Sequence, residues 1–184
     1  MYYMNSSYNN KINFGDIIST VTFMNNPQKI VECGILEGYS LDKFIKNSNN
    51  NTQIDAYDIF DKFNGNHAIK DKIIKQFSPY ENVNISYGDF YEVLKKYPDK
   101  SIDILHIDIA NNGDVYEYMF QNYIHKIKDN GIVLMEGGSK NRDNIKWMVK
   151  YNKPKIQPIL KNWAKIYDIK TIGDIPSITL IKNK

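Results

Sequence analysis

Residues 29–44 read KIVECGILEGYSLDKF, and this stretch predicts a β-strand, a glycine turn and an α-helix in that order. An apolar pair leads to Glu32, and Gly34 and Gly38 follow, four positions apart. An amphipathic segment then begins at Ser40. A parallel strand that enters a helix through glycines places backbone N–H groups and a helix N-terminus against any ligand above the turn. The stretch therefore predicts a ligand site at the carboxyl end of a strand.

The sequence on either side of this stretch alternates between strand and helix patterns. Strands are expected at residues 29–33, 53–58, 83–87, 101–108 and 132–135. Helices are expected at residues 13–24, 40–46, 67–77, 90–97, 115–127 and 141–151. Asp114 is the expected N-cap of the fifth of these helices, and Asn130-Gly131 is its expected end. Residues 163–171 and 175–181 predict an antiparallel hairpin.

This order of elements predicts an α/β fold. We expect a doubly wound, Rossmann-like, mostly parallel seven-stranded sheet with helices on both faces and a C-terminal antiparallel hairpin. The 184 residues suit one domain, with 1–25 as an N-terminal extension or lid. Within it, residues 29–138 are the expected cofactor-binding core, and residues 139–184 a C-terminal helix and β-hairpin.

The composition narrows the classes of partner. With 24 basic and 21 acidic residues, the net charge of +3 is weak support for a nucleic-acid partner, and Arg142 is the only arginine. Cys33 is the only cysteine, which excludes an internal disulfide and favours a reducing compartment. No signal peptide or run of 18 apolar residues is visible. We therefore expect a cytoplasmic protein without a membrane or nucleic-acid partner. Whether it forms a homo-oligomer is left open by the sequence.

Acidic residues mark the ends of all five parallel strands. Glu32 lies near the end of the first strand, and the other four strands lead to Asp58, Asp89, Asp108 and Glu136. Ligands of open α/β sheets bind outside the carboxyl ends of the strands, near the switch point between the first and fourth strands. A row of carboxylates there suits a ligand rich in hydroxyls and amines, or a cation.

In this order, the motifs resemble those of class I S-adenosylmethionine-dependent methyltransferases, particularly the small-molecule O-methyltransferase branch that acts on sugars, macrolides and catechols. ECGILEGYS at 32–40 is similar to the acidic-x-Gly-x-x-x-Gly-x-Ser form of the family's motif I. The similarity continues through AYDIF at 56–60, GDF at 88–90, DILHID at 103–108 and KDNGIV at 128–133. Glu37, between the two glycines, would repel a phosphate, which disfavours a dinucleotide.

The resemblance implies S-adenosylmethionine as the cofactor. The residues that it implies for cofactor binding are Glu32, Gly34, Gly38, Ser40, Asp58, Asp89, Phe90 and Asp108. Asp58 is expected to accept hydrogen bonds from both ribose hydroxyls. Asp89 is expected to accept one from the adenine amino group, with Phe90 packed on the ring. The residues alone leave other interpretations open, since Asp58 can be a loop acid or a helix cap and Asp89 can cap a helix that starts at Tyr91.

The implied reaction is an in-line displacement at the methyl carbon by a hydroxyl oxygen or an amine nitrogen. Asp108 and Glu136 are the candidate catalytic residues, and their spacing is similar to that of two metal ligands in magnesium-dependent catechol-type members. The sequence departs from those members at Gly137, where they carry Asp or Asn. A magnesium site and a metal-free pair that contacts the substrate are both open. His106 is expected to be a core histidine.

The expected acceptor is a small hydroxylated molecule, plausibly a sugar or a glycosylated metabolite. Two other functions remain open. One is a regulatory or scaffold subunit that binds S-adenosylmethionine without transferring its methyl group. The other is a nucleic-acid methyltransferase, but the Asn/Asp-Pro-Pro-aromatic tetrad of that class is absent from the sequence.

Overall fold

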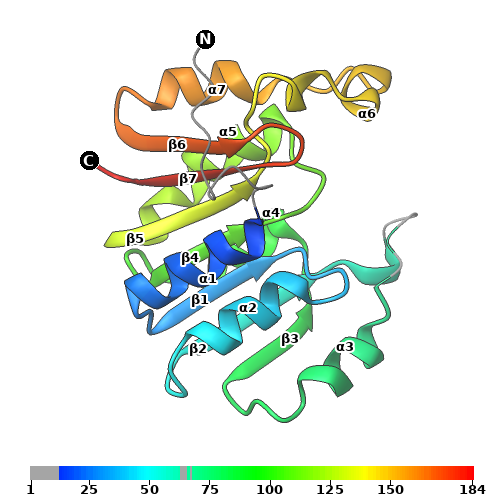
Figure 1. Ribbon diagram of the computed structural model, residues 1–184, viewed down its shortest axis with the longest axis vertical. Coiled ribbons are helices and arrows are strands. Elements are labelled where there is room, and N and C mark those ends of the chain that lie inside the picture. The colour runs from blue at the N-terminus through cyan, green and yellow to red at the C-terminus, as the bar shows by residue number, and fades with distance from the viewer. Residues whose placement is uncertain (1–12, 63–65, 67) are drawn as a thin grey trace, which may run out of the picture.

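The computed structural model describes residues 13–62, 66 and 68–184, and within them seven strands form one sheet in the order β3-β2-β1-β4-β5-β7-β6 (Figure 1). The strands are β1 Lys29–Cys33, β2 Gln53–Asp58, β3 Val83–Tyr87, β4 Ile102–Ile107, β5 Ile127–Glu136, β6 Tyr167–Gly173 and β7 Ser177–Asn183. The first five are parallel, and β7 runs antiparallel to both β5 and β6. The predicted fold class is confirmed.

Helices cover both faces of this sheet, as expected. On one face lie α1 Phe14–Asn25, α2 Tyr39–Asn47 and α3 Lys70–Phe77, with α1 and α2 in front of the strands in Figure 1. On the other lie α4 Phe90–Val93, α5 Gly113–Asn122 and α7 Ile156–Trp163. Successive residues of a strand point to opposite faces. Ile30 therefore packs in the core on the side of α1, α2 and α3, and Val31 in the core on the side of α4, α5 and α7. None of the described helices is long and apolar enough to cross a membrane.

The sheet reverses its winding between β1 and β4, and this places the ligand site. After β3 the chain returns to the centre, where β4 pairs with β1 in the register Glu32 to His106. Both central strands are buried because a helix layer covers each face. Loops that leave the carboxyl ends of neighbouring strands at such a reversal diverge and open a crevice.

The structure corrects the predicted boundaries around α5. The helix begins at Gly113, and the side chain of Asn112, rather than that of Asp114, caps it by accepting from the Asp114 amide at 2.8 Å. After α5 comes the short 3-10 helix η3 Ile124–Lys126, and β5 then starts at Ile127. The expectation that Asn130-Gly131 ends the helix is therefore wrong. Gly131 lies inside a strand whose register with β4 shifts between Ile102 and Ile104.

The C-terminal third holds a helix that the sequence did not reveal. Residues 141–151 form two pieces, the 3-10 helix η4 Arg142–Asn144 and α6 Lys146–Lys150, instead of one helix. Residues 156–163 form α7, so the hairpin expected from residue 163 begins only at Tyr167. The other predicted helices shift by a few residues, and 90–97 divides into α4 and the 3-10 helix η2 Leu94–Lys96. A further 3-10 turn, η1 Phe60–Lys62, follows β2, and the expected helix start at His67 lies outside the described residues.

Candidate active site

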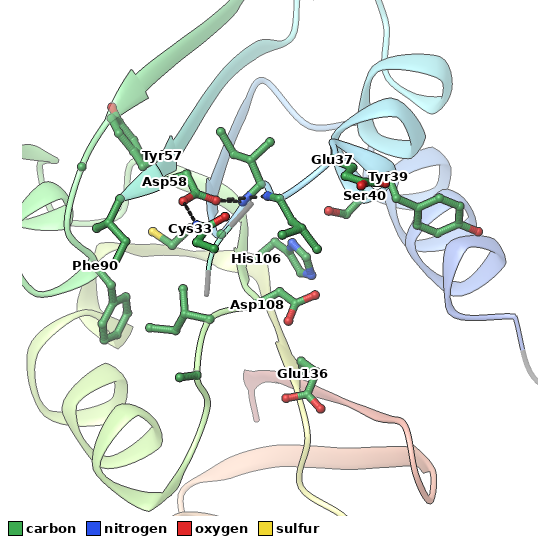
Figure 2. A pocket seen from close by; sticks show the side chains of 18 of the residues that line it. Cys33, Glu37, Tyr39, Ser40, Tyr57, Asp58, Phe90, His106, Asp108 and Glu136 are labelled. Atoms are coloured by element: carbon green, nitrogen blue, oxygen red, sulfur yellow. Dashed lines mark hydrogen bonds between the residues drawn. The ribbon is translucent and has the colours of Figure 1, made fainter. Parts of the chain in front are cut away.

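A cavity of about 660 Å³ lies over the carboxyl ends of β1, β2 and β4 (Figure 2). The loops after these strands and after β3 line it, together with Glu136 at the end of β5, the first turns of α1 and the start of β7. Of the site residues expected from the sequence, those in the lining are Gly34, Ser40, Asp58, Asp89, Phe90, Asp108 and Glu136. Glu32 and Gly38 lie behind this lining. Most of the residues predicted at the strand ends therefore meet at one cavity.

Asp58 organises the loop between β1 and α2. Its Oδ2 accepts hydrogen bonds from the backbone amides of Ile35 at 2.8 Å and Leu36 at 3.1 Å (Figure 2). Its Oδ1 accepts from the Phe60 amide and from Asn66 Nδ2, each at 2.7 Å. The carboxylate is buried, and these four bonds fix the loop at the cavity wall. The expected hydrogen bonds between Asp58 and a ribose stay a prediction. They would be additional to this structural role.

The two glycines of the turn are required by packing against neighbouring loops and helices. Gly34 has a φ of 96°, and a Cβ there would lie 1.9 Å from the Asp108 carbonyl oxygen. Gly38 has a φ of 82°, and its Cβ would lie 2.5 Å from the Phe77 ring. Residues other than glycine rarely adopt such φ values. Gly38 is therefore a packing residue, whereas Gly34 both packs on the β4 loop and lines the cavity.

Glu32 lies fully buried beneath the cavity. Its Oε1 accepts a hydrogen bond from Ser40 Oγ and is 2.9 Å from His106 Nδ1. Burial alone would lower the pKa of His106, but the hydrogen bond and charge of Glu32, together with the charge of Asp108, raise it. Glu32 Oε2 is buried without a hydrogen-bond partner among the described residues. A buried carboxylate oxygen without a hydrogen bond costs free energy, and a hydrogen-bond donor supplied to it would remove this cost.

Asp89 and Phe90 begin α4 at the edge of the cavity. Asp89 is exposed and caps the helix by accepting from the Tyr91 amide at 2.9 Å, which confirms the helix-cap interpretation. Phe90 is buried and makes edge-to-face contacts with Tyr91, Tyr118 and Tyr123. The proposed contacts of Asp89 and Phe90 with an adenine stay predictions.

Asp108 follows β4, and its side chain is exposed to the cavity. Its backbone amide donates to the Cys33 carbonyl at 2.8 Å, and its carboxylate has no hydrogen-bond partner among the residues that the structure describes. Burial raises the pKa of Asp108, and the nearby charges of Glu136 and Glu32 add to this, while His106 and Arg142 oppose it. Asp108 and Glu136 face the same side of the cavity in Figure 2.

Glu136 is paired with Arg142, which the sequence analysis did not include in the site. Arg142 Nε donates to Oε1 and Nη2 to Oε2, both at 2.7 Å. Arg142 Nη2 also lies 3.3 Å from the Asn111 carbonyl oxygen, and its Cζ is 5.3 Å from the centre of the Trp147 ring. Burial lowers the pKa of Arg142, but its bond to Glu136 and that carboxylate's charge raise it overall. Two facts could have pointed to it: Arg142 is the only arginine and lies six residues after Glu136.

The residues at the Asp108–Glu136 edge do not fit the magnesium site that the sequence left open. Both oxygens of Glu136 are engaged by Arg142. Among the described residues no group of three His, Cys, Asp or Glu side chains could hold a metal ion. At Gly137 the φ is 97°, and a Cβ would lie 3.0 Å from Ile156 Cδ1, so this position is ill suited to a ligand side chain.

The half of the cavity away from β2 has a largely apolar wall. It is formed by side chains from α1, from the start of α2 and from the start of β7, namely Phe14, Ile18, Tyr39, Pro176 and Ile178. Helix α1 therefore contributes to the cavity wall. The expected lid at 1–25 stays a prediction, and residues 1–12 of it lie outside the described residues. This half provides room for an acceptor beside Asp108 and Glu136.

Comparison with known proteins gives one family and many structures of similar fold. Residues 31–136 match the family described as a methyltransferase domain. No curated protein matches the sequence. Among solved structures, a methyltransferase from Podospora anserina with bound SAH is 16% identical, with a TM-score of 0.65, covering 93% of this chain and 78% of that one.

Two bacterial structures are similar to the same extent. An O-methyltransferase from Bacillus cereus in complex with SAH is 14% identical, with a TM-score of 0.65, over 97% of this chain and 84% of that one. A methyltransferase from Geobacter sulfurreducens is 17% identical, with a TM-score of 0.63, over 95% of this chain and 79% of that one. At these identities the likeness concerns the fold.

Proposed function

The chain belongs to the methyltransferase domain family, and on this premise we propose that it transfers the methyl group of S-adenosylmethionine to a hydroxyl of a small molecule. The observation that carries the proposal is the charge of the cavity. Among the described residues, five acids line it and neither lysine nor arginine does, the acids being Glu37, Asp58, Asp89, Asp108 and Glu136. Such a wall repels phosphates and favours a cation, and S-adenosylmethionine is cationic at sulfur and carries no phosphate.

The chain offers a distinct group to each part of this cofactor. The fixed loop at Gly34 lies where the amino-acid end would bind. Glu32 lies behind it and would support this end of the site through Ser40, whose hydroxyl donates to Oε1. The end of β2 and the start of α4 would hold the nucleoside, with Asp58 at the ribose and Asp89 and Phe90 at the adenine. The SAH bound by the Podospora and Bacillus proteins supports this choice of cofactor.

Methyl transfer needs alignment of the acceptor and removal of its proton. When bound, the cofactor supplies a methyl group on a sulfonium sulfur. The neutral thioether that remains after transfer is a good leaving group. Asp108 is the proposed proton acceptor, since among the described residues its carboxylate opens into the cavity without a protein donor and its pKa is raised above the usual value of an aspartate. Glu136, held by Arg142, would accept a hydrogen bond from a neighbouring hydroxyl of the substrate.

The proposed acceptor is a small hydroxylated ring, such as a sugar or the sugar of a glycosylated metabolite. Phe14, Ile18 and Pro176 offer an apolar surface for a ring face, while Asp108 and Glu136 meet its hydroxyl edge. The carboxylates argue against an acceptor that places a phosphate in this half of the cavity.

Calorimetric titration with S-adenosylmethionine, followed by transfer of a labelled methyl group to sugars, glycosides and catechols, tests the proposal. We expect one bound cofactor and transfer to a hydroxyl, with S-adenosylhomocysteine as the second product. Absence of binding would reject the function altogether. Binding without transfer to any acceptor would favour the regulatory or scaffold role instead.

A further inference from the structure

We propose that Arg142 is a fixed cation that takes the place of a divalent metal beside Glu136, so that the acceptor half of the site works without a metal ion. The inference rests on the proposed function for its catalytic meaning. Its structural part, a carboxylate kept from metal by a built-in guanidinium, stands on the contacts of Arg142 alone. Arg142 is thereby a positioning residue.

The pairing leaves Glu136 little capacity for a metal. Arg142 approaches both carboxylate oxygens in a parallel, bidentate arrangement at 2.7 Å each. This is the geometry in which a guanidinium binds a carboxylate most strongly. A metal ion would have to displace a buried cation and leave it unpaired, which is strongly unfavourable.

The guanidinium is also prevented from swinging aside. Arg142 is 5% exposed, and Nη2 is anchored to the Asn111 carbonyl oxygen as well as to Glu136. The Trp147 ring lies beside the guanidinium, and the backbone amide of Arg142 donates to Ser139 Oγ at 3.0 Å. The backbone amide and two of the three side-chain nitrogens of Arg142 are thus held, and the guanidinium lies fixed behind Glu136.

The neighbours that could complete a metal shell are turned away or absent. Asn111 presents its amide nitrogen to this edge, where Nδ2 donates to the Glu136 carbonyl at 2.9 Å. Gly137 has no side chain, and its backbone conformation disfavours one. Asp108 is then the only carboxylate of the pair without a fixed partner, and one carboxylate is a poor site for a magnesium ion.

The arrangement gives Arg142 a defined task in the reaction. It holds the Glu136 carboxylate in one orientation at the cavity wall, where that group can accept a hydrogen bond from the substrate. Its own charge lies behind Glu136 rather than in the cavity, so it acts on the acceptor by orienting that carboxylate. A fixed charge does this without an ion to recruit.

Binding of Mn²⁺, followed by electron paramagnetic resonance, tests the inference without any acceptor. We expect wild-type protein to show no saturable binding that differs from that of Glu136→Gln. One Mn²⁺ bound by wild type and lost in Glu136→Gln would overturn the proposal. Both proteins can be checked for folding by circular dichroism.

Variants of Arg142 provide the reciprocal test. Arg142→Gln frees the Glu136 carboxylate beside Asp108, so we expect it to gain a Mn²⁺ site that the double variant Arg142→Gln/Glu136→Gln lacks. Arg142→Lys keeps a cation at the edge and should not gain the site. A purely structural arginine would give no such difference, and a folded Arg142→Gln without added Mn²⁺ binding would contradict the proposal.

Titration of the same proteins with S-adenosylmethionine separates this inference from the proposed function. If wild type binds neither Mn²⁺ nor S-adenosylmethionine, the methyltransferase proposal fails while the guanidinium still keeps metal from Glu136. If it binds S-adenosylmethionine and also a Mn²⁺ that depends on Glu136, only the inference on Arg142 fails.

Discussion

Asp58 holds the loop between β1 and α2 in shape. Its Oδ2 accepts hydrogen bonds from the Ile35 and Leu36 amides. Its Oδ1 accepts hydrogen bonds from the Phe60 amide and the Asn66 side chain. Leu36 adopts a φ of 48°, a left-handed conformation that costs a leucine free energy. Charged hydrogen bonds to its own amide and its neighbour's offset this cost. One carboxylate thereby prepares the backbone for the ligand.

We predict that Asp58→Asn weakens S-adenosylmethionine binding roughly 10- to 100-fold, because an amide nitrogen cannot accept from the loop amides and the charge is lost. Calorimetry measures the change. Asp61→Asn is the matched control, since Asp61 is an exposed acid in the adjacent η1, and its affinity should stay that of wild type. An unchanged affinity in Asp58→Asn would remove Asp58 from the site.

For single residues, the sequence predicted the positions of the acids in the site but not the groups that form hydrogen bonds with them. Parallel strands end at a common edge, so Asp58, Asp108 and Glu136 could be placed at the cavity from strand patterns alone. Arg142 could not, because its contact with Glu136 depends on how the chain turns at Gly137 and Gly138, both with positive φ. The fourfold bonding of Asp58 depends likewise on loops that carry no local pattern.

Among the elements, β1, β2 and β3 are tied together by one buried acid. Asp55 on β2 pairs with Lys29 on β1 and accepts from Asn84 on β3 at 3.0 Å. Tyr97, after η2, donates its hydroxyl to the same carboxylate. Burial would raise the pKa of Asp55, but the hydrogen bonds from Lys29, Tyr97 and Asn84 together lower it.

A folded-state pKa below the ordinary value means that Asp55 stabilises the fold above about pH 3.8 and loses this contribution as the pH falls. We predict that Asp55→Asn lowers the free energy of unfolding by about 1–3 kcal/mol at pH 7. The difference from wild type should shrink towards pH 3 in urea titrations. Asp129→Asn, at an exposed pair with Lys100, should show little effect at either pH. A difference independent of pH would contradict the assignment.

Helix α7 receives its N-terminal cap from a distant part of the chain. Asp143 in η4 accepts hydrogen bonds from the amides of Ile156 at 2.7 Å and Gln157 at 2.9 Å. The N-cap residue itself, Lys155, makes no side-chain cap. Pro158 falls within the first turn of this helix, where its missing N–H is tolerated.

We predict that Asp143→Ala lowers the free energy of unfolding by about 1–3 kcal/mol, because one buried and one partly buried amide at the start of α7 lose their acceptor. The neighbouring exposed residue gives the control, and Asn144→Ala should change stability by less than about 0.5 kcal/mol. Chemical denaturation measures both. Equal stabilities of the two variants would mean that Asp143 does not hold α7.

Elements with local signals were predictable, and those set by tertiary contacts were not. Strands β1 to β4 have apolar patterns bounded by turn residues, and their predicted positions are confirmed within one residue. Helix α7 lacks a local cap, since its cap lies 13 residues away in Asp143. The start of β5 is polar and resembles a helix end, but Gly131 is needed there because a Cβ would lie 2.6 Å from Ile127 Cγ2.

For the molecule as a whole, charge is divided between the surface and the cavity. The chain carries a net charge of +3, yet in the part that the structure describes the cavity is lined by five acids and by no lysine or arginine. Low-dielectric walls strengthen such a local field compared with the same charges in water. We therefore expect the cavity to favour a cation within a protein that is slightly basic overall.

This division predicts how salt affects the two forms of the cofactor. S-adenosylmethionine carries a sulfonium charge that S-adenosylhomocysteine lacks, so its affinity should fall more steeply as ionic strength rises. Parallel calorimetric titrations from low salt to about 0.5 M, where the Debye length is a few ångströms, measure the two slopes. Equal slopes would show that the five carboxylates do not act on the sulfonium.

The most direct test of the central claim is calorimetric titration of the wild-type protein with S-adenosylmethionine. A cofactor site over the Gly34 loop predicts one molecule bound per chain, with the affinity lost or strongly reduced in Asp58→Asn and retained in Asp61→Asn. A wild-type protein that takes up no S-adenosylmethionine, or an Asp58→Asn variant that binds it as wild type does, would contradict the account.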